Sequence, residues 1–105
     1  MRPGLKIVQI QVTYYRAITM VGWLRRDNGD EYLLHNARII TRKSGAASWN
    51  GVAEMAEAGP EERYRLAPIM KEPEELHRLL IKRSHPCDVK AWAKQCPRPK
   101  DWKED

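Results

Sequence analysis

The feature that most constrains this chain is a strict alternation of residue types near its start. From Lys6 to Tyr15, the apolar residues Val8, Ile10 and Val12, followed by Tyr14, alternate with polar ones. A period of two, rich in β-branched side chains, predicts a β-strand with one buried face. The sequence of this segment therefore predicts a strand that pairs with at least one other strand.

Two further strands are expected, over residues 17–25 and 31–41, because both segments continue the alternation. Asn28 and Gly29 lie between them, and an Asn-Gly pair supplies the positive φ angles of a tight hairpin loop. Gly22 inside the second strand indicates a β-bulge or a close approach of another backbone. Residues 5–42 are thus predicted to form a three-stranded antiparallel meander.

A short helix should follow the third strand within the stretch Arg38–Pro60. Ser48 is a suitable N-cap, because its hydroxyl can accept a hydrogen bond from a free amide of the first turn. Gly59 followed by Pro60 ends a helix. The glutamates of this segment should face outward. One apolar stripe should pack on the sheet, formed by Trp49, Val52, Ala53 and Ala56.

The second half of the chain is less regular. Residues 61–75 read as a charged loop with a short strand near 64–69, and residues 74–84 fit a strand and a helix equally well. Asp88 can cap a short final helix through Gln95. We expect an α+β fold, mainly antiparallel β: a small meander or barrel-like sheet with one short central helix and one short C-terminal helix. Residues 1–99 form one domain, and residues 100–105 a polar tail.

The bulk properties favour a cytosolic chain. No apolar run approaches the length of a membrane helix, and the first residues lack the apolar region of a signal peptide. Cys87 and Cys96 are expected to be reduced, structural thiols. With His85 they offer three metal ligands at most, which is a weak signal, so no metal or other cofactor is expected.

The motifs of common enzyme classes are absent from the sequence. There is no Gly-rich dinucleotide fingerprint, P-loop or HExxH pair, and the three histidines are scattered. His35, in the third strand, reads as an ordinary surface histidine. Carboxylates adjacent in sequence do not converge on one substrate. We therefore expect a protein that is not an enzyme.

The charge pattern favours an anionic partner. The net charge of +5 divides into +5 for residues 1–47, −4 for residues 48–76 and +4 for residues 77–105. Basic surfaces attract phosphates, and aromatic rings stack on bases. Cations and tyrosines end the predicted first and third strands, close to the turn that enters the helix, where free amides also favour anions. Two other interpretations fit these residues equally well. The turn can be a connection that simply caps the helix, and the charges can belong to a sheet edge that resists aggregation.

Four segments of the chain, in order over residues 14–96, resemble a family of small phage and prophage proteins. Residues 15–24 are similar to its Tyr-Ser-Ala-Gly-Val-His-x-Gly-x-Leu, and residues 33–40 to its Val-Leu-Lys-Asn-x-Arg-Arg-Ile. Residues 44–53 resemble its Trp-x-Gly-Ala-x-Ser-Leu-x-x-Leu-Ala, and residues 80–87 resemble its strand ending in Ile-Pro-Cys. The family is identified with anti-Thoeris proteins that act as sponges for cyclic ADP-ribose-type signals and cyclic oligonucleotides.

The resemblance implies a phage anti-defence protein in the host cytoplasm. Such a protein binds and sequesters a cyclic nucleotide messenger without cleaving it, as a homo-oligomer, either a dimer or a hexamer. The resemblance also implies a strand at residues 74–84. Together with the basic ends described above, it assigns the ligand-binding residues as Tyr15, Arg16, Ala17, Arg38, Arg42, Lys43, Gly45, Ala47, Ser48 and Trp49.

In this assignment the arginines and Lys43 bind phosphates, and the backbone amides of residues 45–48 donate hydrogen bonds to the ligand. Tyr15 or Trp49 stacks on a base, although Trp49 fits a core position equally well. This chain departs from the family pattern at Arg16, at residues 18–20 and at residues 41–42. If these positions touch the ligand, the departures imply a different messenger or none. Two alternatives remain: a small β-barrel that binds nucleic acid, and a phage structural or partner-binding protein that docks through residues 54–75.

Overall fold

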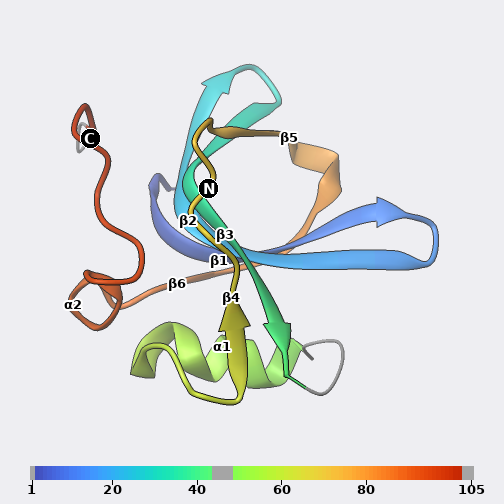
Figure 1. Ribbon diagram of the computed structural model, residues 1–105. Helices are drawn as coiled ribbons and strands as arrows, with labels where there is room; N and C mark the ends of the chain where they lie inside the picture. Colours follow the sequence, from blue (N-terminus) through green and yellow to red (C-terminus); the bar gives the residue numbers. More distant parts are fainter. Residues whose placement is uncertain (1, 44–48, 103–105) are drawn as a thin grey trace.

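The computed structural model describes residues 2–43 and 49–102, and these form an α+β fold built mainly of antiparallel strands (Figure 1). The predicted fold class is therefore confirmed. No helix within the described residues is long and apolar enough to cross a membrane. The elements in chain order are β1 (Gly4–Thr13), β2 (Arg16–Asn28), β3 (Glu31–Arg42), α1 (Trp49–Ala58), β4 (Tyr64–Leu66), β5 (Glu74–His77), the 3₁₀ helix η1 (Arg78–Leu80), β6 (Ile81–Pro86) and α2 (Val89–Trp92).

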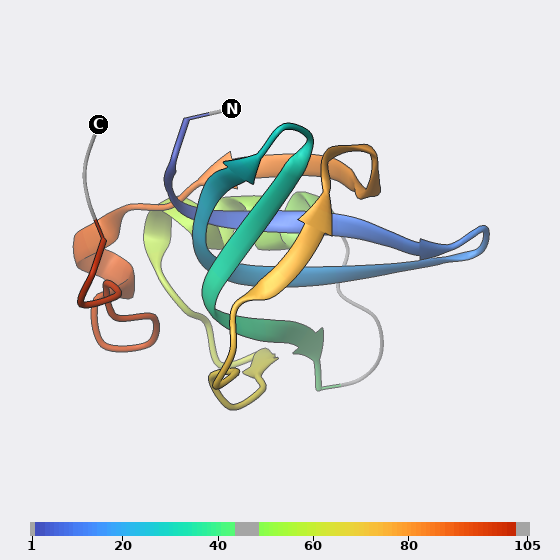
Figure 2. The same ribbon diagram turned by 90° about the horizontal axis from the view of Figure 1, so that it is seen from above.

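The strands form one open, strongly curved sheet with the order β4-β3-β2-β1-β6. Strands β1, β2 and β3 are antiparallel neighbours, as the meander predicted. β3 is long enough to pair with β4 near its end and with β5 near its start. Because only the three residues of η1 separate β5 from β6, this short connection spans from the β3 side of the sheet to the β1 side. The sheet consequently curls around an interior (Figure 2).

Two glycines act as the sequence predicted. Gly29 turns the β2–β3 hairpin with a φ of +60°, a left-handed conformation that glycine adopts at little cost. Gly22 lies where the β2–β3 register shifts, between Val21 and Trp23. A Cβ atom added to Gly22 would lie 2.7 Å from Cγ of Leu34 and 3.0 Å from the carbonyl oxygen of His35. The bulge and the close approach are therefore both present.

The prediction of one buried face for β1 is wrong. Leu5 and Ile7 pack in a cluster beneath α1 and α2, whereas Val8 and Ile10 pack in a second cluster on the other face of the sheet. Both faces of β1 are buried because the curled sheet encloses one face while the helices cover the other. At its far end the strand leaves both clusters, and Val12 is 51% exposed.

Helix α1 begins and ends where the sequence indicated. The amide of Gly59, with a φ of +100°, donates to the carbonyl oxygen of Met55 at 2.8 Å and closes the C-terminus of the helix. Glu54 and Glu57 are exposed, as predicted. The buried stripe, however, is centred on Val52, Met55 and Ala56, so the expected stripe omitted its central methionine.

The C-terminal half differs in detail from the prediction. Residues 74–84 contain strand structure, but as two strands separated by η1 rather than one. Asp88 caps α2 through hydrogen bonds from the amides of Lys90 (2.9 Å) and Ala91 (3.3 Å), but the helix ends at Trp92 and not at Gln95. Trp102, which the sequence placed in the polar tail, packs on Trp23 with ring centroids 5.2 Å apart.

Candidate functional site

The β1–β2 hairpin projects from the body of the molecule and carries the most exposed aromatic rings of the described residues (Figures 1 and 2). Tyr14 is 88% exposed and Tyr15 is 93% exposed, and their rings meet edge to face with centroids 4.8 Å apart. Arg16 and Ala17, which follow them, are also exposed. Tyr15, Arg16 and Ala17, which the sequence analysis assigned to ligand binding, are therefore all exposed.

The projection exists because the neighbouring strands stop early. Pairing of β2 with β3 reaches only Thr19 and Ile40, and pairing of β1 with β6 reaches only Ile10 and Ile81. Beyond these points, among the described residues, β1 and β2 pair only with each other. The outer edges of the hairpin therefore present main-chain groups as well as rings.

Arg42 and Lys43, at the end of β3, are exposed cations on a separate projection. Arg42 lies opposite Tyr64 in β4, and the amide of Lys43 donates to the carbonyl oxygen of Arg63 at 3.1 Å. The exposed Arg65 lies beside them, opposite Thr41. Arg65 was missed by the sequence reading, since nothing in its neighbourhood indicates that β4 returns to this end of β3.

Arg63 also lies near the end of β3, but its guanidinium already forms an ion pair within the protein. Its Nε donates to Oε2 of Glu61 at 2.7 Å, and its guanidinium lies 5.1 Å from the ring centre of Tyr64. The cationic group open at this end of β3 therefore consists of Arg42, Lys43 and Arg65.

Arg38 does not belong to this group. Its guanidinium donates to the carbonyl oxygens of Ala67 (2.7 Å), Gln95 (2.9 Å) and Leu66 (3.3 Å) and to the side chain of Gln95 (3.1 Å). These bonds hold the segment after β4 and the C-terminal segment against β3. Arg38 is thus a structural clamp, because the donors predicted to bind phosphate are occupied by backbone carbonyls.

The remaining predicted residues fall at the start of α1. Trp49 is partly buried and packs against the cluster beneath the helix, so its role as a core residue is supported. Gly45, Ala47 and Ser48 lie outside the described residues.

The structure does not join the hairpin and the end of β3 into one pocket lined by the described residues. Continuing the β2–β3 register by two residues would place Ala17 opposite Arg42, but β3 pairs with β4 there and β2 with β1. Figures 1 and 2 show the hairpin and the end of β3 diverging. Both groups lie beyond the same end of the β2–β3 pairing.

His35 is not the ordinary surface histidine that the sequence indicated. It is partly buried, and Nε of Arg25 donates to its Nε2 at 3.0 Å, which requires that nitrogen to be unprotonated. Desolvation by burial, and then the charge of Arg25, lower the pKa of His35. Its ring also contacts Trp102, with centroids 6.2 Å apart. The neutral imidazole is the form that the folded protein favours.

Two clefts flank the C-terminal segment. This segment lies on the side of the molecule away from the β1–β2 hairpin (Figures 1 and 2). One, of about 430 Å³, lies between His35, Lys71 and residues 97–101. The other, of about 570 Å³, lies between residues 2–4, Trp23 and Trp102. Neither was expected from the sequence, because their walls come from segments that are far apart along the chain.

The two cysteines lie in the cluster beneath α1 and are free thiols. Burial is the main cause that raises the pKa of both Cys87 and Cys96 to about 12. Thiols in this state are protonated and unreactive at neutral pH. Among the described residues, no group of three or more histidine, cysteine or acidic side chains is arranged to hold a metal ion.

No protein-family model matches this chain, and neither a curated protein nor a solved structure matches it.

Proposed function

We propose that the protein binds and sequesters an anionic ligand that carries a base, of the cyclic nucleotide class, without cleaving it. The observation that carries this proposal is the pair of exposed rings, Tyr14 and Tyr15, which lie beyond the same end of the β2–β3 pairing as the exposed cations Arg42, Lys43 and Arg65. Rings that face solvent stack on bases, and cations bind the phosphates between bases. The sequence resemblance gives the biological setting: a phage protein that lowers the level of an immune messenger in the host cytoplasm.

A homo-oligomer, either a dimer or a hexamer, suits this function. The hairpin and the end of β3 are separate projections, so a small ligand held between them in one chain would remain open to water. A second copy would close the site and release that water. Light scattering with and without ligand measures the assembly directly.

Calorimetry with cyclic ADP-ribose isomers and cyclic di- and trinucleotides tests the proposal. We expect saturable binding of one class, weakened at least tenfold by Tyr15→Ala and by the pair Arg42→Gln and Lys43→Gln. The recovered ligand should be chemically unchanged. Lys82→Gln, an exposed cation on β6, serves as the control and should bind normally. Absence of heat with every ligand in the panel would refute the proposal.

Binding of single-stranded nucleic acid is the second candidate, and the projection of the β1–β2 hairpin from the body of the molecule favours it. A projecting hairpin with unpaired edges can lie against an extended strand more readily than it can enclose a small molecule. In this case affinity for an oligonucleotide should fall steeply with salt, with a slope of about 0.7 for each phosphate contacted. A flat salt dependence would exclude this candidate.

A further inference from the structure

The cleft beside His35 and Asn36 is lined by β3 and by two further segments, and both of these are bound to the same few residues of β3. The amide of Met70 donates to the carbonyl oxygen of Ala37 at 2.9 Å and so places Lys71 at the mouth of the cleft. The C-terminal segment is held by Nδ2 of Asn36, which donates to the carbonyl oxygen of Pro97 at 2.8 Å. The hydrogen bond from the Arg38 guanidinium to the carbonyl oxygen of Gln95 also holds the C-terminal segment against β3. The walls of the cleft are therefore fixed before any ligand arrives.

Asn36 has an unusual backbone. Its φ of +53° is the one positive value found at a non-glycine residue among the described residues. Asparagine tolerates this left-handed conformation better than most residues, but the conformation remains strained. The surrounding contacts maintain it, since the Cys96 thiol donates to the carbonyl oxygen of Asn36 at 3.3 Å. Such backbone strain tends to occur at ligand sites.

The charges around this cleft are mostly positive. Lys71, Arg98 and Lys100 line it together with a single carboxylate, that of Asp101. The guanidinium of Arg98 lies 5.1 Å from the ring centre of Trp23, which lines the second cleft, so Arg98 stands between the two clefts and lines both. Several cations that line one concave surface create a local positive potential and attract anions.

We propose that this cleft binds a phosphomonoester: a small organic molecule whose terminal phosphate is held by Lys71, Arg98 and Lys100. Lysine binds phosphate as a point charge and arginine through a fork of N–H donors. The volume of about 430 Å³ exceeds what a bare phosphate ion fills and falls in the range of small-molecule sites. Three prolines, Pro73, Pro97 and Pro99, give the organic part of the ligand a rigid apolar wall.

The test is an NMR titration of the whole protein with ribose 5-phosphate at constant ionic strength, with ribose as the control ligand. We expect saturable shifts of the backbone amides of the non-proline residues that line or adjoin the cleft with ribose 5-phosphate and none with ribose; these are His35, Asn36, Lys71, Glu72, Arg98, Lys100 and Asp101. The variant pair Lys71→Gln and Lys100→Gln should raise the Kd at least tenfold. The pair Lys82→Gln and Arg83→Gln on β6 changes the net charge equally and should leave the Kd unchanged.

Three outcomes would overturn the inference. The first is the absence of saturable shifts up to about 10 mM ribose 5-phosphate, well above the Kd of a specific site. The second is equal weakening by both variant pairs, which would indicate general charge attraction. The third is binding of inorganic phosphate with no binding of ribose 5-phosphate. The Tyr14→Ala and Tyr15→Ala variants should retain this binding, so failure of the proposed messenger binding at the hairpin is distinguishable from failure here.

Discussion

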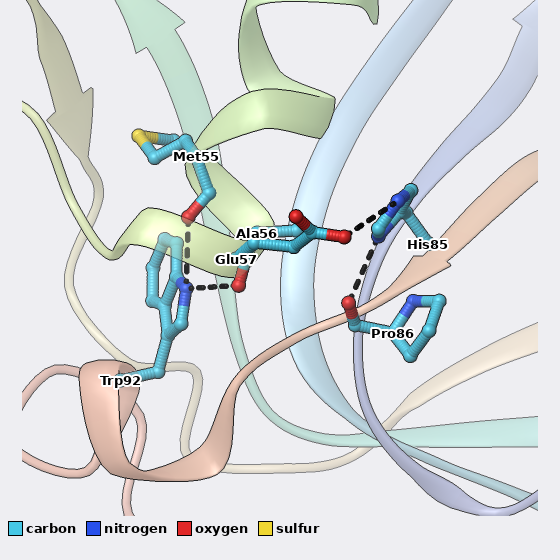
Figure 3. A network of polar contacts seen from close by, with 6 residues as sticks. All are labelled: Met55, Ala56, Glu57, His85, Pro86 and Trp92. Atoms are coloured by element: carbon cyan, nitrogen blue, oxygen red, sulfur yellow. Dashed lines mark hydrogen bonds and ion pairs between the residues drawn. The ribbon is translucent and has the colours of Figure 1, made fainter.

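The indole nitrogen of Trp92 donates to the carbonyl oxygen of Met55, 3.2 Å away and 37 residues earlier in the chain. The same N–H reaches the carbonyl oxygen of Ala56 at 3.1 Å, so one donor is shared by two carbonyls of the last turn of α1 (Figure 3). The amide of Asp88 also donates to Ala56, at 2.9 Å. The C-terminus of α1 is thus capped by α2 and its N-cap, and Trp92 is fully buried there.

Trp92→Phe should lower the free energy of unfolding by about 1–3 kcal/mol, because it removes a shared hydrogen bond and leaves a small cavity. Urea denaturation at 25 °C measures this. Val89→Ala is the matched control on the same short helix, and because Val89 is 42% exposed it should cost about 0.5 kcal/mol or less. Equal losses in the two variants would contradict the buried role of Trp92.

Gly22→Ala should destabilise the protein by about 1–3 kcal/mol. The new methyl group would lie 2.7 Å from Cγ of Leu34 and 3.0 Å from a backbone oxygen, so the fully buried Leu34 and the β3 bulge must shift to admit it. Thermal unfolding followed by circular dichroism measures the loss. Gly29→Ala is a useful comparison: nothing lies within 4 Å of its added Cβ, so its cost should reflect only the φ of +60°, about 1 kcal/mol.

Arg38 and Arg42 lie on the same strand and should respond in opposite ways to the same substitution. Arg38→Gln should cost about 2–3 kcal/mol of stability, because hydrogen bonds from a charged group to several carbonyls are lost. Arg42→Gln should change stability by about 0.5 kcal/mol or less, because Arg42 is exposed, but it should weaken ligand binding.

Urea denaturation and calorimetry on both variants separate the two roles. Arg38→Lys should not restore full stability, since a lysine cannot reproduce the planar fork of donors. Full recovery by lysine would indicate that charge, and not the network of hydrogen bonds, holds the segments together.

The stability of the protein should fall as the pH rises above about 9. Cys87 and Cys96 have pKa values raised from 9.0 to about 12 in the folded state, mainly by burial. Between these values the unfolded chain loses thiol protons that the folded protein keeps, so unfolding becomes more favourable with pH. The slope reaches at most about 1.4 kcal/mol per pH unit for each thiol.

The double variant Cys87→Ala and Cys96→Ala isolates this effect, because lysines and tyrosines also titrate at high pH. The difference in unfolding free energy between the native chain and the variant should shrink from pH 8 towards pH 11. A difference that stays constant with pH would show that the thiols are not the cause. A thiol reagent at pH 8 should also react with the native protein only as it unfolds.

Local chemistry in the sequence was sufficient for several of the elements and their ends. The alternation from Lys6 onward, the turn at Asn28 and Gly29, the helix stop at Gly59 and the cap at Asp88 each depend on a few adjacent residues. Their dihedral preferences and short-range hydrogen bonds are the same in any fold, so these features could be read without a structure.

The candidate site could be predicted only in part. Tyr15, Arg16, Arg42 and Lys43 are exposed as expected, because strand ends that bear charge and rings seldom enter a core. Whether two strand ends converge depends on where pairing stops, and the sequence contains no signal for that. The cleft beside Asn36 escaped the prediction for the same reason: its walls are three segments that meet only in the folded chain.

By itself, then, the sequence determined the α+β architecture, the order of the strands in the meander and the ends of α1. Only the tertiary structure decided which face of each element is buried and what each cation does. Arg38 and Arg42 show the difference: they are the same residue type four positions apart, yet one is held by the carbonyls of distant segments and the other faces water. Backbone preference is a local property, whereas burial and hydrogen-bond partners depend on which remote parts of the chain pack together.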